Sequence, residues 1–161
     1  MSDQNTASAN KTTYRAEGDR EIITERIFNA PREKVYETML DPELIPQWWG
    51  RRQDTTTVDK FEARKGGDWR FVTSSDDGEH VFRGTIRDLV PPEKIEQTFE
   101  WGGMPGYVCV ETALLEDLGD GRTKLVNVSL FHTTEERDGM LSAMEGGAEE
   151  THDRLEELLS K

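Results

Sequence analysis

The chain has 161 residues, which is enough for one domain and short for two. Its 33 acidic and 20 basic residues give a net charge of -13, and such a charge repels the phosphates of nucleic acids and anionic membrane surfaces. Mean hydropathy is low, at -0.78, but four Trp, six Phe and three Tyr supply large side chains for a core. We therefore expect one folded domain that binds neither nucleic acid nor membranes. The acidic excess fits either a saline habitat or ordinary solubility.

Cysteine and histidine are scarce, which excludes several kinds of site. The single cysteine, Cys109, allows neither an internal disulfide nor a multi-cysteine zinc site. The three histidines, His80, His132 and His152, match no zinc-binding spacing, so we expect no metal and no cofactor. The sequence has no run of about 18 apolar residues and no secretory signal at its start, so the cytoplasm is the expected compartment.

Residues 1–18 are mostly small and polar, and we expect them to form a disordered tail before a folded domain at residues 19–161. Residues 20–29 are rich in Ile and Phe, which predicts a strand. Apolar residues at helical spacing then predict two short helices, over residues 31–40 and 43–50.

From residue 55 to residue 131 the pattern changes to strands. Alternating residues and turn signals predict strands over residues 55–63, 69–74, 79–90, 95–101, 107–116 and 123–131. A long amphipathic helix is expected from Thr134 onward, and Gly146-Gly147 predicts a kink or a close contact within it. This order of elements predicts an α+β fold, in which a curved antiparallel sheet wraps around the C-terminal helix and leaves a cavity between them.

Several short motifs, in this order, resemble START-like (SRPBCC) domains of the family named after the activator of Hsp90 ATPase. The motifs are Ala30-Pro31, Trp48-Trp49-Gly50, Gly66-Gly67, Pro91-Pro92-Glu93-Lys94 and the closing helix, and the resemblance covers about residues 20 to 160. It implies a helix-grip (START/Bet v 1-like) fold with two short helices after the first strand and an internal pocket. Ala148 stands where many relatives carry Trp, and His152 stands where an apolar residue is usual. The first departure implies a larger pocket mouth or a shifted pocket floor, and the second implies a less dry helix face.

Candidate ligand-binding residues come mainly from aromatic side chains that alternate along the predicted strands. Such residues either fill a core or line a cavity, and the resemblance favours a cavity. Two methionines of the long helix would face it as adaptable lining, and His80 and Tyr107 would orient a ligand as polar groups. The full set is Trp49, Trp69, Phe71, His80, Phe82, Phe99, Trp101, Tyr107, Met140, Met144 and Ala148.

The predicted strand at residues 107–116 has two registers. In the first, Val108, Val110, Thr112 and Leu114 face the core; in the second, Tyr107, Cys109, Glu111 and Ala113 do so. We favour the first, because it buries four residues without a charge. The second would make Glu111 a buried carboxylate with a raised pKa and a candidate functional group.

Three functions are consistent with these observations. The leading hypothesis is a binding protein that holds a small apolar or aromatic ligand between the sheet and the helix. The second is an interaction protein that assists an Hsp90-like partner, although an 18-residue tail cannot replace the additional N-terminal domain of the family's namesake. The third is an enzyme of the polyketide cyclase or dehydratase type, in which only His80, His132, Glu111 or Tyr107 could act as acid or base.

Overall fold

The computed structural model describes residues 10–143 and 147–161 of the chain. Within them, eight strands form one antiparallel sheet in the order β1-β2-β8-β7-β6-β5-β4-β3. The strands are β1 (Thr13–Glu17), β2 (Glu21–Phe28), β3 (Thr55–Phe61), β4 (Asp68–Ser75), β5 (Gly78–Val90), β6 (Lys94–Trp101), β7 (Val108–Asp117) and β8 (Thr123–Leu130). The helices are α2 (Arg32–Met39), α3 (Ile45–Trp48), α4 (Thr134–Ala143) and α5 (Gly147–Leu159).

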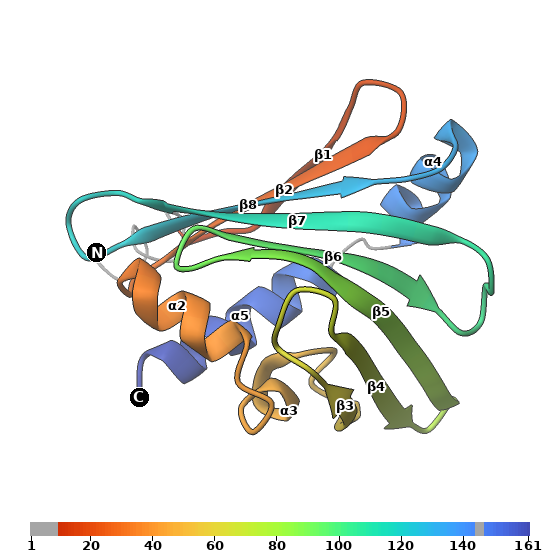
Figure 1. Cartoon of the computed structure of the whole chain (residues 1–161), viewed down its shortest axis with the longest axis horizontal. Helices are drawn as coiled ribbons and strands as arrows, with labels where there is room; N and C mark the ends of the chain where they lie inside the picture. Colours follow the sequence, from red (N-terminus) through yellow and green to blue (C-terminus); the bar gives the residue numbers. More distant parts are fainter. Residues whose placement is uncertain (1–9, 144–146) are drawn as a thin grey trace.

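The sheet curves around α5, as Figure 1 shows. Helices α2 and α3 follow β2 in the chain and contact α5, and α3 also contacts β3. The expected helix-grip arrangement is confirmed: one curved antiparallel sheet holds a C-terminal helix, and two short helices lie beside that helix.

The core lies between the sheet and α5. Leu155 and Leu159 of α5 are buried in one cluster with Phe28 of β2 and with Val35 and Tyr36 of α2. Val35 and Tyr36 are among the apolar residues whose helical spacing predicts a helix over residues 31–40. Burying a Leu side chain completely contributes about 1.5–3 kcal/mol to stability, so these contacts fix α5 against the sheet.

The first strand lies within the residues predicted to be a disordered tail. Thr13–Glu17 pairs with residues 21–25 of β2 as an antiparallel hairpin, and Asn10 and Thr12 just before it are buried. The predicted tail of residues 1–18 is therefore too long at its C-terminal end. The polar composition of the segment gives no sequence signal for this strand, because backbone pairing and polar contacts hold it in place rather than apolar burial. Residues 1–9 lie outside the described part of the chain.

The predicted long C-terminal helix consists of two helices in the described residues. Helix α4 contacts β1 and β2, whereas α5 contacts α2 and α3, so the two helices pack against different elements. Figure 1 shows α4 near one end of the sheet and α5 beneath its curved face. Helix α5 begins at Gly147, close to the predicted kink; Gly146 and the candidate ligand residue Met144 lie outside the described residues.

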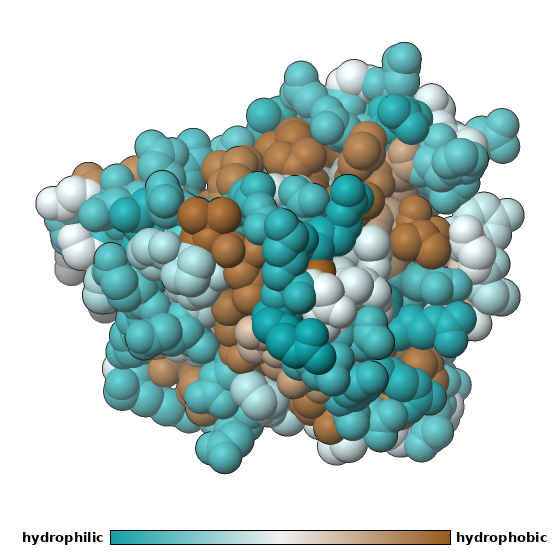
Figure 2. Space-filling view, viewed as in Figure 1, coloured by the Kyte–Doolittle hydropathy of each residue, from teal (hydrophilic) through white to brown (hydrophobic). Residues whose placement is uncertain are grey.

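Hydrophilic residues dominate the face of the molecule in Figure 2, with hydrophobic residues gathered in patches between them. No helix in residues 10–143 or 147–161 is long and apolar enough to cross a membrane.

Candidate functional site

A cavity of about 170 Å³ lies between the curved face of the sheet and helices α2, α3 and α5. Its size is close to that of an apolar cavity of about 150 Å³, which can hold a benzene molecule. One side of the lining is aromatic and aliphatic, and the other carries polar groups. The lining residues are Met39, Leu40, Ile45, Trp48, Trp49, Phe61, Phe71, Ile95, Gln97, Glu111, Ala113, Leu125, Asn127 and His152.

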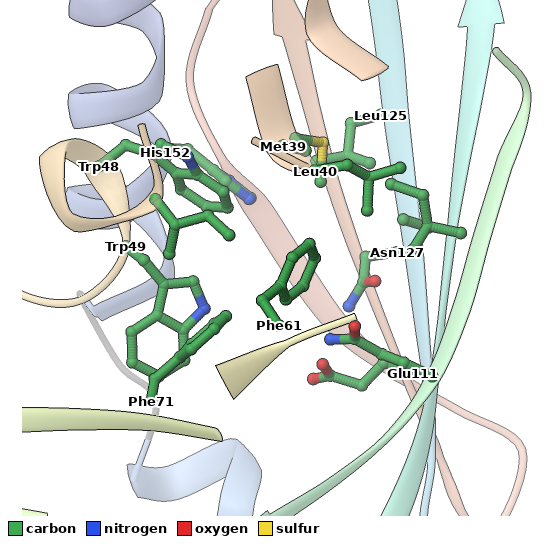
Figure 3. A pocket seen from close by; sticks show the side chains of 14 residues that line it. Met39, Leu40, Trp48, Trp49, Phe61, Phe71, Glu111, Leu125, Asn127 and His152 are labelled. Carbon is green, nitrogen blue, oxygen red and sulfur yellow. The ribbon is translucent and has the colours of Figure 1, made fainter. Parts of the chain in front are cut away.

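Trp49 is the centre of the aromatic wall. Its ring meets Phe71 of β4 edge to face at 5.1 Å between ring centroids, and it meets Phe82 of β5 in the same way at 4.9 Å. Edge-to-face pairs at these distances are favourable beyond simple burial. Figure 3 shows Trp49 and Phe71 side by side, with Phe61 nearer the middle of the pocket.

The backbone after α3 is held in place by α5, and this fixes the position of Trp49. The Arg154 guanidinium donates from Nη1 to the carbonyl oxygens of Trp49, Gly50 and Arg51, at 3.2, 2.9 and 3.1 Å. Thr56 Oγ1 donates to the same Trp49 carbonyl at 2.9 Å. The aromatic wall is therefore tied both to α5 and to β3.

The polar wall comes from three neighbouring strands. Glu111 of β7 pairs in register with Gln97 of β6 on one side and with Ser129 of β8 on the other. Asn127, two residues before Ser129, also lines the cavity. In Figure 3, Glu111 and Asn127 lie on the strand side of the pocket, opposite Trp48 and His152.

Glu111 is an ionisable group with an unusual environment. Burial raises its pKa from 4.5 to about 7, while the neighbouring Gln97 side chain works in the opposite direction. Protein surrounds the carboxyl group, but it faces the cavity and so remains partly accessible to a molecule there. Near neutral pH the carboxyl group can thus exchange a proton, a property typical of functional groups.

His152 of α5 faces the cavity from the other side and is a neutral imidazole. Burial lowers its pKa to about 3, and the positive charge of Arg26 acts in the same direction. Its Nδ1 lies 2.9 Å from Thr12 Oγ1, and its ring meets Phe28 edge to face at 5.8 Å. His152 is thus held by the residues before β1, by β2 and by its own helix.

Arg26 of β2 joins the residues before β1 to α5. Its side chain is only 4% exposed and forms ion pairs with Asp153 and Glu156 of α5, each at 2.8 Å. It also donates to Thr12 Oγ1 at 3.1 Å. Asn10 completes the connection, since its amide donates to Glu156 at 2.7 Å. We call Asn10, Thr12, Arg26, Asp153 and Glu156 the N-terminal clasp.

Comparison with known proteins places the chain in a family. The family described as "Activator of Hsp90 ATPase homolog 1-like protein" matches residues 29–160. The chain belongs to this family. A search of proteins with curated functions found no match.

Solved structures agree with the family assignment. A Rhodobacter sphaeroides protein is 25% identical with a TM-score of 0.83, over 92% of this chain and 97% of that one. An Arthrobacter aurescens protein is 22% identical with a TM-score of 0.83, over 92% of this chain and 91% of that one. DynU16, a protein of the dynemicin biosynthetic locus, is 17% identical with a TM-score of 0.67, over 89% of this chain and 48% of that one. All three likenesses show the fold.

Within this family member, two of the predicted ligand residues, Trp49 and Phe71, line the cavity. Three others form an aromatic layer next to it. Phe82 contacts Trp49, and Phe99 lies 5.7 Å from Phe82 and 6.0 Å from Trp69 between ring centroids. Alternation along β4, β5 and β6 thus placed these side chains on the correct face of the sheet, although most of them fill the core.

The remaining candidates lie elsewhere. His80 and Trp101 contact each other, with ring centroids 5.6 Å apart, and Tyr107 is 52% exposed. Met140 packs in a second core cluster on α4, and Ala148 is a half-buried residue of α5. Of the polar groups predicted to orient a ligand, neither His80 nor Tyr107 belongs to the cavity lining.

The preferred register of residues 107–116 is wrong. The second register is observed for Cys109, Glu111 and Ala113, whereas Tyr107 lies before β7 and is exposed. Cys109 and Ala113 are buried, whereas Val108 and Leu114 are 42% and 40% exposed. Glu111 therefore faces inward. The carboxyl group is tolerated there because it borders a cavity instead of close-packed apolar side chains.

Sequence reasoning missed Gln97 and Asn127 as members of the site. Alternation predicts that Gln97 shares a strand face with Ile95 and Phe99, but it does not predict that this face borders a cavity there. Asn127 carries no comparable signal, because its position depends on the pairing of β7 with β8. In the described residues, no three His, Cys, Asp or Glu side chains are grouped so that they could hold a metal ion.

Proposed function

We propose that the protein binds a small, mostly apolar ligand in the cavity between the sheet and α5. The observation that supports this most directly is the cavity itself, with Trp49 and Phe71 on one wall and Glu111 on the other. Known ligand sites share this plan, in which an apolar lining supplies affinity and a few polar groups fix orientation. A volume of about 170 Å³ suits a ligand with one ring rather than a fused aromatic system.

The proposal is tested with toluene and phenol as probes. NMR shift changes of the Trp48 and Trp49 indole N–H groups report binding at the cavity. In Ala113→Leu, a larger side chain fills part of the cavity, so the shift changes should disappear. The same exchange at exposed Ala16 on β1 is the matched control and should leave them intact. If neither probe shifts the two indole signals, or if Ala113→Leu binds as the unchanged protein does, the proposal is wrong.

A second candidate function is acid–base catalysis in the same cavity, and Glu111 is the observation that favours it. A general acid or base works best when its pKa lies near the working pH, and that of Glu111 is about 7. Turnover of a polyketide-type substrate with one ring would then be lost in Glu111→Gln. It would persist in Glu116→Gln, an exposed carboxylate on the same strand. Equal turnover in both variants would contradict this function.

A further inference from the structure

The polar wall of the cavity offers hydrogen-bond acceptors but no cation. No Lys or Arg is among the described residues that line it, so the Glu111 carboxyl group has no basic partner there. Asn127 donates from its amide nitrogen to Ser129 Oγ at 3.3 Å, which leaves its amide oxygen free to accept. A ligand that pairs with the Glu111 carboxylate and the Asn127 amide oxygen must therefore bring donors.

The basic residues His152 and Arg26 do not supply the missing charge. His152 is neutral, because burial and Arg26 lower its pKa to about 3. Arg26 is engaged by Asp153 and Glu156, at 2.8 Å each. The groups that face Glu111 from the packed elements are Gln97 on β6, Ser129 and Asn127 on β8 and His152 on α5, and all of them are uncharged.

We propose that the ligand is a small amine, whose ammonium group donates to the Glu111 carboxylate while its apolar body lies against Trp49 and Phe71. This inference rests on the proposed function and names the chemical class of the ligand. A charged hydrogen bond to a carboxylate is about twice as strong as a neutral one. The net charge of -13 further favours the approach of a cation.

Binding of an ammonium ion would be coupled to a proton. Below about pH 7 the empty site holds a protonated Glu111, and this proton must leave when an ammonium group takes its place. Affinity for the amine should therefore rise by roughly tenfold per pH unit between about pH 5 and pH 7, and level off above. A neutral ligand of the same shape should show no such rise.

Benzylamine and benzyl alcohol are the matched probes, because they differ only in the donor group. Affinities are measured by NMR titration of the Trp49 indole signal at pH 7.5, for the unchanged protein, Glu111→Gln and Glu116→Gln. We expect benzylamine to bind at least roughly tenfold more tightly than benzyl alcohol. This preference should vanish in Glu111→Gln and persist in Glu116→Gln.

The outcomes separate this inference from the function on which it rests. If benzyl alcohol binds as tightly as benzylamine, or if Glu111→Gln keeps the preference, the ligand is not an amine, although the cavity still binds ligands. If neither probe binds and toluene also fails, both proposals are overturned. Calorimetry of the unchanged protein at pH 6, in two buffers of different ionisation enthalpy, tests the inference without any variant. It should show release of close to one proton per benzylamine bound, and no release would contradict the inference.

Discussion

Glu111 makes a specific contribution to the pH dependence of stability. Its pKa rises from 4.5 to about 7 on folding, so the folded protein holds this proton more tightly than the unfolded chain does. Between these two values the folded state binds more protons, and its stability must fall as pH rises. One pKa unit corresponds to about 1.4 kcal/mol, so the shift gives about 3 kcal/mol, lost between about pH 4.5 and pH 7.

In the Glu111→Gln variant, the side chain at position 111 carries no charge at any pH. The variant therefore lacks the loss of stability that Glu111 causes between about pH 4.5 and pH 7. We expect the free energy of unfolding of the variant minus that of the unchanged protein to be about 3 kcal/mol higher at pH 8 than at pH 4.5. The free energy of unfolding is measured by urea denaturation at intervals across this range. The lowered pKa of His152 acts with the opposite sign, because its contribution is lost as pH falls below about 6.5. That contribution is common to both proteins and cancels in their difference.

Glu116→Gln is the matched control, because Glu116 lies on the exposed face of the same strand. Its difference from the unchanged protein should vary little with pH. If the Glu111→Gln difference is equally flat, or grows toward acidic pH, then the carboxyl group does not pass from water into a poorly solvating site on folding. The assignment of Glu111 to the cavity wall would then be refuted.

Three further predictions concern single residues. Gly84→Ala should destabilise the protein by about 3 kcal/mol in urea denaturation, because the added Cβ would lie 1.9 Å from the Thr98 carbonyl oxygen. Gly139→Ala has no neighbour within 4 Å of the added Cβ and should stabilise the protein by up to about 1 kcal/mol. Equal effects of the two substitutions would contradict the packing argument. Burial raises the pKa of Cys109, so a thiol reagent should label it only after unfolding; rapid labelling of the native protein would show otherwise. The His152 ring should show no NMR titration between about pH 5 and pH 8, since its pKa is about 3, and a midpoint near neutrality would be incompatible with its burial.

The sequence predicts most strands because alternation and turn residues are local signals. The hairpin between β4 and β5 is an example: Asp76-Asp77-Gly78 marks the turn, and Ser75 pairs with Gly78. The inward aromatic residues of β4 and β5 follow from the same alternation. The prediction of β7 failed where alternation gives two answers, because the apolar residues on its two faces are nearly balanced. The choice there depends on a cavity, and a cavity is a property of the assembled fold.

The N-terminal clasp escaped prediction for a related reason. Asn10 and Thr12 are small polar residues in a polar segment, and nothing local distinguishes them from a solvated tail. Their burial depends on Arg26 and on Glu156 and His152 of α5. The two α5 residues lie more than a hundred positions further along the chain. Such long-range polar contacts produce no periodic pattern in the amino-acid sequence.

The strand order has a consequence for how this domain is delimited. The family match begins at residue 29, yet β2 ends at Phe28 and pairs along its whole length with β8. A fragment trimmed to the matched residues would lose β1, β2 and Arg26, and it would leave the long edge of β8 open to pairing with other chains. The region that the family model matches is thus shorter than the sheet with its N-terminal clasp, which includes residues from Asn10 onward.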